Sequence, residues 1–509
     1  MQVGALAAVL VALPYKAFDL DRYFVPKELV VALTATIAVL ACLAAARRLA
    51  LTRVDTLLAA FLVLSAVSAL GATNGWLAWR ALAVSLAGIG LFWAARTLAG
   101  AGLARAVLAG VALAVVAAAV TSLLQAYGVS TELFSLNRAP GGTLGNRNFV
   151  AHEIVAGLPT LVYLAVGTRR PLRFVLAAAG ITLLTWALVL SRSRAAWLAV
   201  GVALVLTTFV VLRAPGKWGG ATTGWRAIVL AGCAALGAVA AVTLPNTLHW
   251  KSASPYLDSA LGVADYREGS GHGRLVQYSR SMSLVAAHPV LGVGPGNWAV
   301  AYPKVADSHD PSLSEDDGMT ANPWPSSDWV AFVSERGLVA TACLALALLG
   351  LVVTAWGTGV NGLALMATVI AVLLTGAFDA VLLLPAPAAV IWPALGALAA
   401  PAASKIVIPF PRVFRVAVGV VVLLFGGVAI WRSGSQAIAM GLYGDGSHAT
   451  ALTWAAQVDP GSYRIQERLA EVDLHRGRCA GVRLHAGAAH RLFPNAPAPR
   501  RALAECPRR

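Results

Sequence analysis

The chain has 509 residues, of which 58% are hydrophobic and only 12% are charged, and its formal net charge is +16. Soluble domains carry about 25% charged residues, so the composition excludes an ordinary soluble protein. The positive charge does not indicate a nucleic-acid partner, because basic residues recur in the short segments between long apolar runs.

Apolar runs recur from the first residues to about residue 431, and they have the length of about 17–25 residues that a membrane helix requires. They predict an all-α polytopic membrane protein with about 12–13 transmembrane helices. Alternating segments of about ten residues, typical of membrane β-barrels, do not occur. The expected spans are 2–18, 29–46, 54–71, 77–96, 105–127, 149–167, 172–190, 195–212, 227–245, 334–356, 361–383, 385–402 and 413–431.

Basic residues mark one side of the membrane. If the N-terminus is inside, the loops richest in arginine are cytoplasmic, as the positive-inside rule expects. Three longer polar segments then lie outside together: a loop near 128–148, a segment from 246 to 333, and a tail. We therefore divide the chain into a transmembrane domain, 1–431, which includes the outer loop 246–333, and a small helical tail, 432–509. The inner basic residues are Arg47, Arg48, Arg53, Arg96, Arg105, Arg169, Arg170, Arg173, Arg213, Lys217, Arg226, Lys405, Arg412 and Arg415.

The first candidate site is the stretch GGTLGNRNFVAHE at 141–153. Its glycines allow a tight backbone turn, and Asn146 and Asn148 can bond ligand hydroxyls. Glu153 follows just inside the next span, where it could contact a substrate. The alternative is a loop that only caps the helix, with an asparagine as the N-cap.

Arginines form the second candidate site. Arg192 and Arg194 lie at the outer end of the span 172–190, although the positive-inside rule predicts few arginines there. An arginine in the middle of a membrane helix costs about 2.5–3.5 kcal/mol, so this pair either reaches the water boundary or meets an anion. Arg274 begins an amphipathic helix at 273–289 in the outer loop. Several arginines on one side would suit a diphosphate, because guanidinium binds phosphate in a bidentate manner.

The third candidate site is SSDWVAFVSERGLVA at 326–340, which leads into a span. Ser326, Ser327 and Asp328 are polar residues at its start and are candidates for a direct role in chemistry. The alternative is a helix N-cap, which is worth about 1 kcal/mol. Metalloprotease HExxH, paired CxxC and P-loop motifs are absent from the sequence.

The tail contains an internal repeat. Ala455, Val458 and Pro460 recur at positions 489, 492 and 494 as Ala, Leu and Pro, and a shift of about 34 residues is the tetratricopeptide period. The alternative is a tail that is merely helical. Two of the five cysteines, Cys479 and Cys506, also lie in the tail; a disulfide and two unpaired thiols are both open.

These stretches, in this order, resemble the O-antigen ligase family of bacterial envelope proteins, which includes O-antigen ligases, O-antigen polymerases and some protein O-oligosaccharyltransferases. The resemblance covers roughly residues 30–400. GTLGNRNFVA is similar to the family's GTxGNPNxLA, with Arg147 in place of the proline. SRAAWLAV is similar to SRGAWLAL, which places Arg194 on the family's arginine.

The later motifs extend the resemblance. GRLVQYSRSMSLVAAHPVLGVGPGNW is similar to a family segment that places Arg274 on a second functional arginine. SSDWVAFVSERGLVA resembles HNDYLQLLAExGLIG, but Ser326 stands where the family has a histidine that is important for transfer. The base that would replace it stays open between His272, His309, Glu153 and Asp328, and divergence in activity is a further alternative.

The resemblance implies a glycosyltransferase of the bacterial inner membrane, with its active face and tail in the periplasm. Such an enzyme moves a glycan from a polyprenyl-diphosphate donor to a hydroxyl of lipid A core, a lipid-linked glycan or a protein. It implies an inverting, metal-independent reaction without a cofactor, and the tail could recruit an envelope assembly partner. Two other classes remain: a flippase or transporter of lipid-linked sugars, and a non-catalytic assembly protein.

Overall fold

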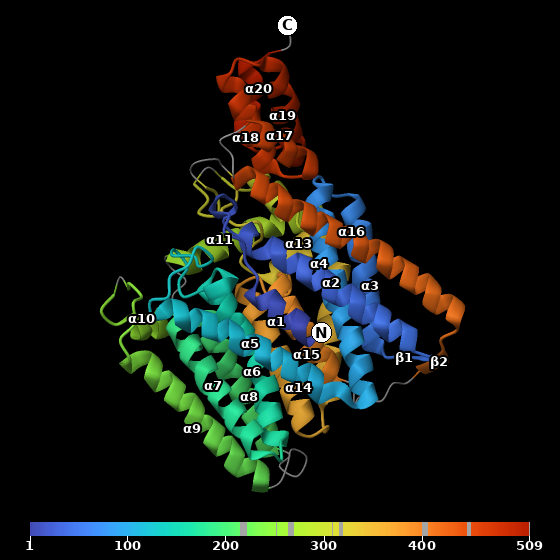
Figure 1. The fold of residues 1–509 in the computed structure, drawn as a ribbon, viewed down its shortest axis with the longest axis vertical. Coiled ribbons are helices and arrows are strands. Elements are labelled where there is room, and N and C mark those ends of the chain that lie inside the picture. The colour runs from blue at the N-terminus through green and yellow to red at the C-terminus, as the bar shows by residue number, and fades with distance from the viewer. Residues whose placement is uncertain are drawn as a thin grey trace.

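The structure is a computed structural model that describes residues 1–213, 221–250, 252–262, 269–307, 309–314, 319–399, 406–444 and 449–507. Long helices form a bundle, and a group of short helices lies at one end of it (Figure 1). Among the described residues, ten helical segments are long and apolar enough to cross a membrane. The prediction of an all-α polytopic membrane protein is therefore confirmed.

One of the ten segments, Gly75–Ala126, contains two helices, α4 and α5, which are joined by a π-turn at Ala99–Leu103. Gly102 has a φ of 85° in this turn, a left-handed conformation that glycine adopts without a steric penalty. The long helices are α2 (Asp21–Ala45), α3 (Arg53–Leu70), α4 (Gly75–Leu98), α5 (Ala104–Ala126), α6 (Arg147–Gly167), α7 (Pro171–Ser191), α8 (Arg194–Arg213), α9 (Ala221–Thr243), α13 (Asp328–Ala355), α14 (Val360–Phe378) and α16 (Arg412–Gly444).

Two of the predicted spans are shorter than expected. The first, predicted at 2–18, is the nine-residue helix α1 (Gln2–Leu10), followed by residues 11–15 without helical structure, among which Pro14 lies. The other, predicted at 385–402, is α15 (Pro385–Ala399), whose 15 residues are all buried. At 1.5 Å per residue neither reaches the roughly 30 Å of the hydrocarbon core. α15 is apolar because it packs inside the bundle, which apolar composition alone does not reveal, whereas only Ala5, Ala8 and Val9 of α1 are buried.

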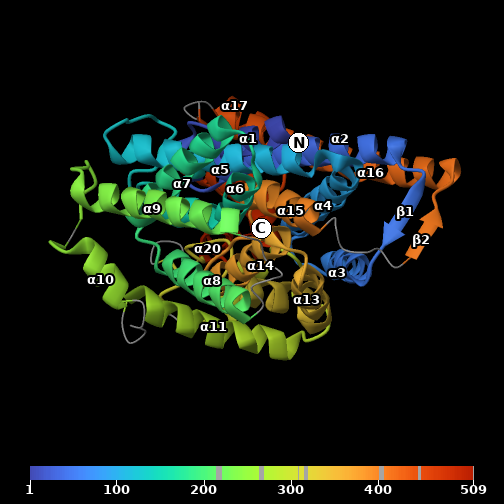
Figure 2. The same cartoon turned by 90° about the horizontal axis from the view of Figure 1, so that it is seen from below.

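The structure also contains two short strands that the sequence did not predict. β1 (Arg48–Leu51) pairs with β2 (Ile406–Pro409) in an antiparallel ribbon, with Arg48 opposite Pro409 and Leu51 opposite Ile406. The ribbon joins the connection between α2 and α3 to the segment before α16, at the right-hand edge of the bundle in Figure 2. It therefore ties the long helix α16 to the N-terminal half of the chain.

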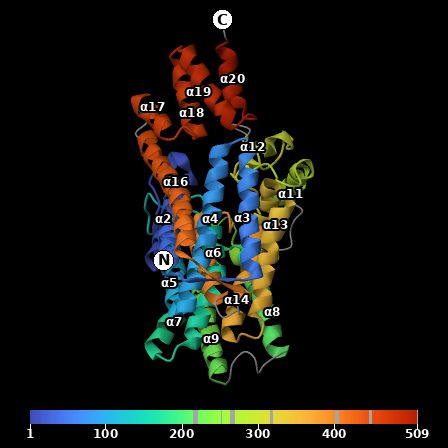
Figure 3. The same cartoon turned by 90° about the vertical axis from the view of Figure 1, so that its right-hand side faces the viewer.

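The polar segments of the chain gather at the end of the bundle that carries the tail, which we call the tail face. Figure 3 shows α11 (Gly269–Ala287) and α12 (Trp298–Ala301) beneath the tail helices, while α8 and α9 extend toward the opposite end. The amide of Thr247 donates to the carbonyl of Ala126 at 2.9 Å, and Asn495 Nδ2 donates to the carbonyl of Val300 at 2.9 Å. The three segments predicted to share one side of the membrane thus lie together.

The segment 288–298 is fastened to α13 by a buried carboxylate. Glu335 Oε2 accepts a hydrogen bond from the amide of Gly296 at 2.8 Å, and its Oε1 accepts one from the amide of Trp298 at 3.2 Å. The amides of Val293 and Gly294 donate to backbone carbonyls of α13 at 2.9 and 2.8 Å. Because Glu335 is only 2% exposed, these bonds satisfy a charge that would otherwise be costly to bury.

Gly337 makes this close approach possible. Its φ of 81° and ψ of 171° interrupt α13, in a region of conformational space that is essentially restricted to glycine. A Cβ atom at this position would lie 2.0 Å from the carbonyl oxygen of Val290. The glycine in the SERGLVA motif is therefore needed where the outer segment meets the membrane helix.

The tail consists of four helices, α17 (Ala449–Val458), α18 (Tyr463–His475), α19 (Cys479–Leu492) and α20 (Pro497–Glu505). α17 and α19 both end two residues before a proline, at Pro460 and at Pro494, in register with the predicted repeat. The tail packs on the membrane domain: Arg432 forms a 3.0 Å ion pair with Asp459, and its guanidinium lies 4.1 Å from the ring centroid of Trp76. The helical tail is thus described, whereas its tetratricopeptide character stays a prediction.

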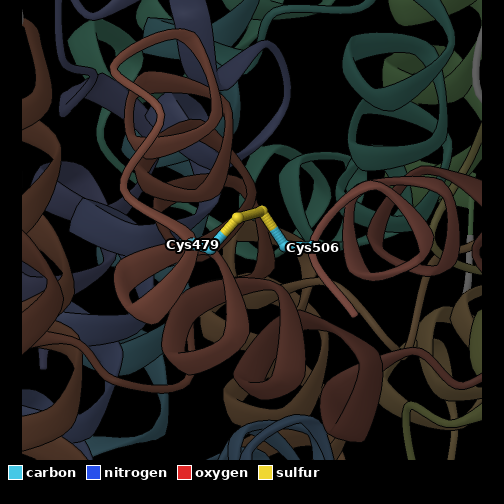
Figure 4. The surroundings of a disulfide bond; sticks show 2 residues. All are labelled: Cys479 and Cys506. Atoms are coloured by element: carbon cyan, nitrogen blue, oxygen red, sulfur yellow. A yellow bond between two sulfur atoms is a disulfide. The ribbon is translucent and has the colours of Figure 1, made fainter. Parts of the chain in front are cut away.

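Cys479 and Cys506 form a disulfide that joins the start of α19 to the end of α20 (Figure 4). The bond closes a small core in the tail that also contains Ala470, Val482 and Ala486. The other three cysteines are free and half-buried. Of the two alternatives left by the sequence, the structure has the disulfide.

We expect Gly337→Ala to lower stability more than Gly357→Ala. Both glycines have positive φ, but Gly357 has open space around it, whereas Gly337 would place a methyl group against a backbone carbonyl. The left-handed conformation alone costs an alanine about 1–2 kcal/mol, and the clash adds to this at Gly337. Thermal unfolding in detergent would measure the difference. Equal melting temperatures for the two variants would contradict this account of the contact.

We expect the double substitution of Cys479 and Cys506 by serine to destabilise the tail selectively. Their separation of 27 residues implies a loop-closure contribution of about 3.5 kcal/mol in the chain-entropy model. Limited proteolysis should then cleave the tail faster than the membrane domain, and reduction of the wild type should have the same effect. Unchanged cleavage of the tail after complete reduction would argue against a stabilising role.

Candidate functional site

The N-terminus of α6 lies at the tail face and is shaped by a glycine turn. Gly145 has a φ of 76°, and a Cβ there would lie 2.4 Å from the ring of Tyr23. Asn146 then caps the helix, because its side-chain oxygen accepts a hydrogen bond from the amide of Asn148 at 2.9 Å. The capping role that the sequence left as an alternative is thus the one the structure gives to Asn146.

Asn148 occupies the first turn of α6 and faces the end of α14. Its Nδ2 donates to Oδ2 of Asp379 at 3.4 Å. Asp379 follows the last residue of α14 and is 9% exposed, while Asn148 is half-buried. Asn148 therefore connects the α6 N-terminus to a carboxylate that lies at the edge of the polar region.

Three arginines interact electrostatically at this helix end, and we call Arg147, Arg192 and Arg194 the arginine cluster. Arg147 begins α6, and its charge is opposed by the charges of both other arginines. Arg147 stands where the family motif has a proline, and Arg192 and Arg194 belong to the second predicted site. The cluster therefore connects these two parts of the sequence. Mutual repulsion of this kind is reduced when an anion binds between the guanidinium groups.

Arg192 and Arg194 are held by the segment 250–262. Arg192 has a left-handed φ of 53° between α7 and α8; its Nε donates to Ser259 Oγ at 2.9 Å, and its guanidinium lies 4.6 Å from the ring centroid of Trp250. Burial lowers the pKa of Arg192, although the neighbouring carboxylate of Asp258 opposes this effect. Arg194 is exposed and donates to the carbonyl of Gly262 at 2.5 Å.

Arg274 approaches α6 from α11, which lies along the lower edge of the bundle in Figure 2. It is half-buried, and its charge interacts with the side chain of His152 on α6. Arg147 and His152 are five positions apart on α6, which corresponds to about 7.5 Å along the helix axis. The first turns of α6 thus connect the two arginine-bearing regions.

His152 was not among the residues that the sequence singled out. It is only 1% exposed, and neither of its ring nitrogens has a hydrogen-bond partner among the described residues. Its neighbours include the charged side chains of Asp379 and Arg274. A histidine in an apolar run resembles a core residue, but its position one helical turn after Asn148 was a signal that could have found it.

Ser327 and Asp328 have structural partners. Ser327 caps α13, accepting from the amide of Val330 at 3.4 Å and donating to the carbonyl of Gly376 at 3.1 Å. The Asp328 carboxylate accepts from the amides of residues 381, 382 and 383, at 2.9, 2.8 and 3.4 Å. Both side chains are buried. Ser327 has the helix-cap role that the sequence left as an alternative, whereas Asp328 binds the backbone at 381–383 and does not cap its own helix.

Ser326 lies at the turn before α13 and is half-buried. Its amide donates to Oε1 of Gln277 at 2.7 Å, and its carbonyl accepts from the hydroxyl of Tyr278. Both partners belong to α11, the helix that carries Arg274. The position of the family's histidine is thus fixed beside α11 even though the residue here is serine.

The remaining predicted residues lie elsewhere. Glu153 is fully buried and interacts with Lys27 of α2, whose Nζ donates to the carbonyls of Val9 and Val11. His272 and His309 are exposed on the tail face. The structure therefore does not place these three side chains in the arginine cluster. The sequence also has two adjacent carboxylates, Asp316 and Asp317, which are a weak candidate for metal binding and lie outside the described residues.

A cavity of about 860 Å³ lies between α2, α3, α4 and α16, and Arg48 and Arg96 are among its lining residues. Most of its walls are apolar side chains of the membrane helices. None of the residues of the candidate site lines it. Its position beside β1 sets it apart from the polar region at the tail face.

We expect Asp328→Ala to lower stability as well as activity. The substitution would leave buried backbone amides without their acceptor, at a cost of about 1–3 kcal/mol for each unsatisfied group. Asp307→Ala, at an exposed carboxylate on the same face, is the matched control. Melting temperature and size-exclusion profile would be measured together. An Asp328→Ala protein with wild-type stability and no activity would instead indicate a direct catalytic role.

A family model described as O-antigen ligase matches residues 178–345. The matched region contains Arg192, Arg194, Arg274, the stretch 326–328 and Glu335, and thus most of the features of the candidate site. No curated protein matches the chain. The resemblance inferred from the sequence motifs is confirmed over this region: residues 178–345 of this multi-pass membrane protein match the O-antigen ligase family.

Proposed function

We propose that the protein transfers a glycan from a polyprenyl-diphosphate donor to an acceptor hydroxyl at the tail face. The observation that carries the proposal is the arginine cluster beside the N-terminus of α6, within a fold whose central region matches the O-antigen ligase model. Anions are favoured at a helix N-terminus, where free amide groups and the positive end of the helix dipole are found. A diphosphate fits both this helix end and the guanidinium groups.

In the proposed reaction, the acceptor oxygen attacks the anomeric carbon and the bond from that carbon to the diphosphate oxygen breaks. Negative charge then develops on the leaving diphosphate. Arg194 and Arg274, together with Arg192 and Arg147, stabilise this charge in a partly dehydrated site, where electrostatic stabilisation is strongest. Arginines perform the role that a metal ion has in many phosphate-binding enzymes, so the proposed reaction uses no metal or cofactor.

We assign the tail face to the periplasm of a bacterial inner membrane. The disulfide between Cys479 and Cys506 suits an oxidising compartment. The opposite face carries the arginine-rich connections, among them the β1 segment, as the positive-inside rule expects of a cytoplasmic face. The proposed chemistry and the tail then share the compartment in which a flipped lipid-linked glycan is available.

The acceptor distinguishes three sub-types. Lipid A core as acceptor defines a ligase, a growing lipid-linked glycan defines a polymerase, and a protein defines an oligosaccharyltransferase. We favour a polymerase or a protein-glycosylating enzyme, because the helical tail sits over the tail face and offers a surface for a second macromolecule. The tail could equally hold an envelope assembly partner close to the site.

Reconstitution in liposomes tests the proposal. The wild type should consume a polyprenyl-diphosphate-linked oligosaccharide in the presence of a panel of acceptors, with product size followed by mass spectrometry. One transfer to lipid A core indicates a ligase, and a ladder of lipid-linked chains indicates a polymerase. Donor that crosses the bilayer without cleavage would overturn the transferase and favour transport.

We expect Arg194→Ala and Arg274→Ala each to lower the transfer rate by about 10²–10³-fold, the loss seen when one charge-stabilising donor is removed from an active site. Arg280→Ala is the matched control on α11, because this exposed side chain pairs with Asp307 and takes no part in the proposed site. Wild-type rates in both test variants would remove the arginines from the mechanism.

A further inference from the structure

The family's histidine is replaced by Ser326, so the proposed transfer lacks its expected proton acceptor. A serine hydroxyl does not accept a proton at neutral pH, whereas an imidazole titrates in that range. Asp328 is occupied by three backbone amides. Glu153 is buried and neither of its carboxylate oxygens has a hydrogen-bond partner among the described residues, but the charge that acts on it is that of Lys27 and not that of an arginine of the candidate site.

His152 has the properties that the missing group requires. Its ring is almost fully buried, and both nitrogens lack a hydrogen-bond partner in the described part of the chain, although buried polar atoms in proteins are usually bonded. It lies on α6 one turn deeper than Asn148, and the charges of Asp379 and Arg274 act on it. An unpartnered imidazole beside the second arginine of the site points to a ligand hydroxyl as its partner.

Position 326, where the family has its histidine, is also connected to Asp379. The backbone of Asp328, two residues after Ser326, donates to the carbonyl of Asp379 at 3.2 Å, and Asn148 bonds the Asp379 carboxylate. The start of α13, which follows Ser326 by two residues, and the first turn of α6, which precedes His152, thus both hydrogen-bond to Asp379. A histidine on either element reaches the region next to this carboxylate.

We propose that His152 is the general base of the transfer reaction and takes the place of the histidine that the family has at position 326. This inference rests on the proposed function. A ring nitrogen of His152 accepts the proton of the acceptor hydroxyl while the acceptor oxygen bonds to the anomeric carbon. The polyprenyl diphosphate leaves with the electron pair of the broken bond.

In this proposal, the charged neighbours of His152, which are Asp379 and Arg274, each have a role. Asp379 stabilises the imidazolium that forms when His152 takes the proton, and Asn148 holds the Asp379 carboxylate in place. Arg274 attracts the departing diphosphate on the same side. The proton and the leaving group are therefore received by neighbouring residues of α6 and α11.

The test compares His152→Gln and His152→Ala with the wild type in the liposome assay. His475→Gln, at an exposed histidine of the tail, is the control. Transfer should fall by about 10²–10⁴-fold in both His152 variants, the usual contribution of a general base. Binding of polyprenyl diphosphate, which probes the arginines but involves no proton transfer, should be unchanged, and this also shows that the variants are folded.

A second variant separates catalysis from structure. Adding Ser326→His to His152→Ala should restore part of the lost transfer, because a base returns at the position where the family has one. A purely structural role of His152 would not be repaired by a histidine on another helix. Absence of any recovery would overturn the equivalence of the two positions.

The remaining outcomes are distinct. If the wild type transfers glycan and His152→Gln does so at the same rate, the base assignment is overturned while the proposed function stands. If both His152 variants lose transfer and polyprenyl-diphosphate binding together, His152 supports the fold or the donor site, and it is not the base. If the wild type does not transfer glycan at all, the proposed function falls, and the inference falls with it.

Discussion

The buried carboxylate of Glu335 is the contact on which the tail face depends. It binds two amides of the segment before α12, in surroundings where an unpaired charge would be strongly unfavourable. The next residue in that segment, Asn297, exchanges hydrogen bonds with Asn74, and the Asn74 side chain donates to the carbonyl of Leu492 in the tail. One fixed turn therefore connects a membrane helix, the outer segment and the tail, and it sets where α11 and Arg274 lie.

Within the family motifs, some residues hold the structure together and others are available for the proposed chemistry. Ser327, Asp328 and Glu335 satisfy backbone groups in the apolar bundle, where unpaired amides cost several kcal/mol. The ring nitrogens of His152, by contrast, have no hydrogen-bond partner among the described residues. A motif that looks catalytic because it is polar and lies in a membrane helix can thus serve mainly to hold the catalytic elements together.

Both differences from the family pattern concern the same small region. Arg147 replaces a proline at the start of α6, and it lies with Arg192 and Arg194. Ser326 replaces a histidine, while α6 carries His152 two turns inside its N-terminus, near Arg274. Ser326 itself contacts α11, whereas Arg147 and His152 lie in the first turns of α6. In our proposal, α6 therefore carries both an additional positive charge and the base.

The sequence by itself determined the membrane class, most of the spans and the shared side of the polar segments, because apolar length and basic loops are local features; the roles of Arg194 and Arg274 stay predictions from motif order. Only the tertiary structure decided that α1 and α15 are short and that α15 is buried, since a helix that faces protein is as apolar as one that faces lipid. It also decided the disulfide, the supporting roles of Ser327 and Asp328, and the setting of His152. These depend on which groups meet across the bundle, and that is a property of packing between helices distant in sequence.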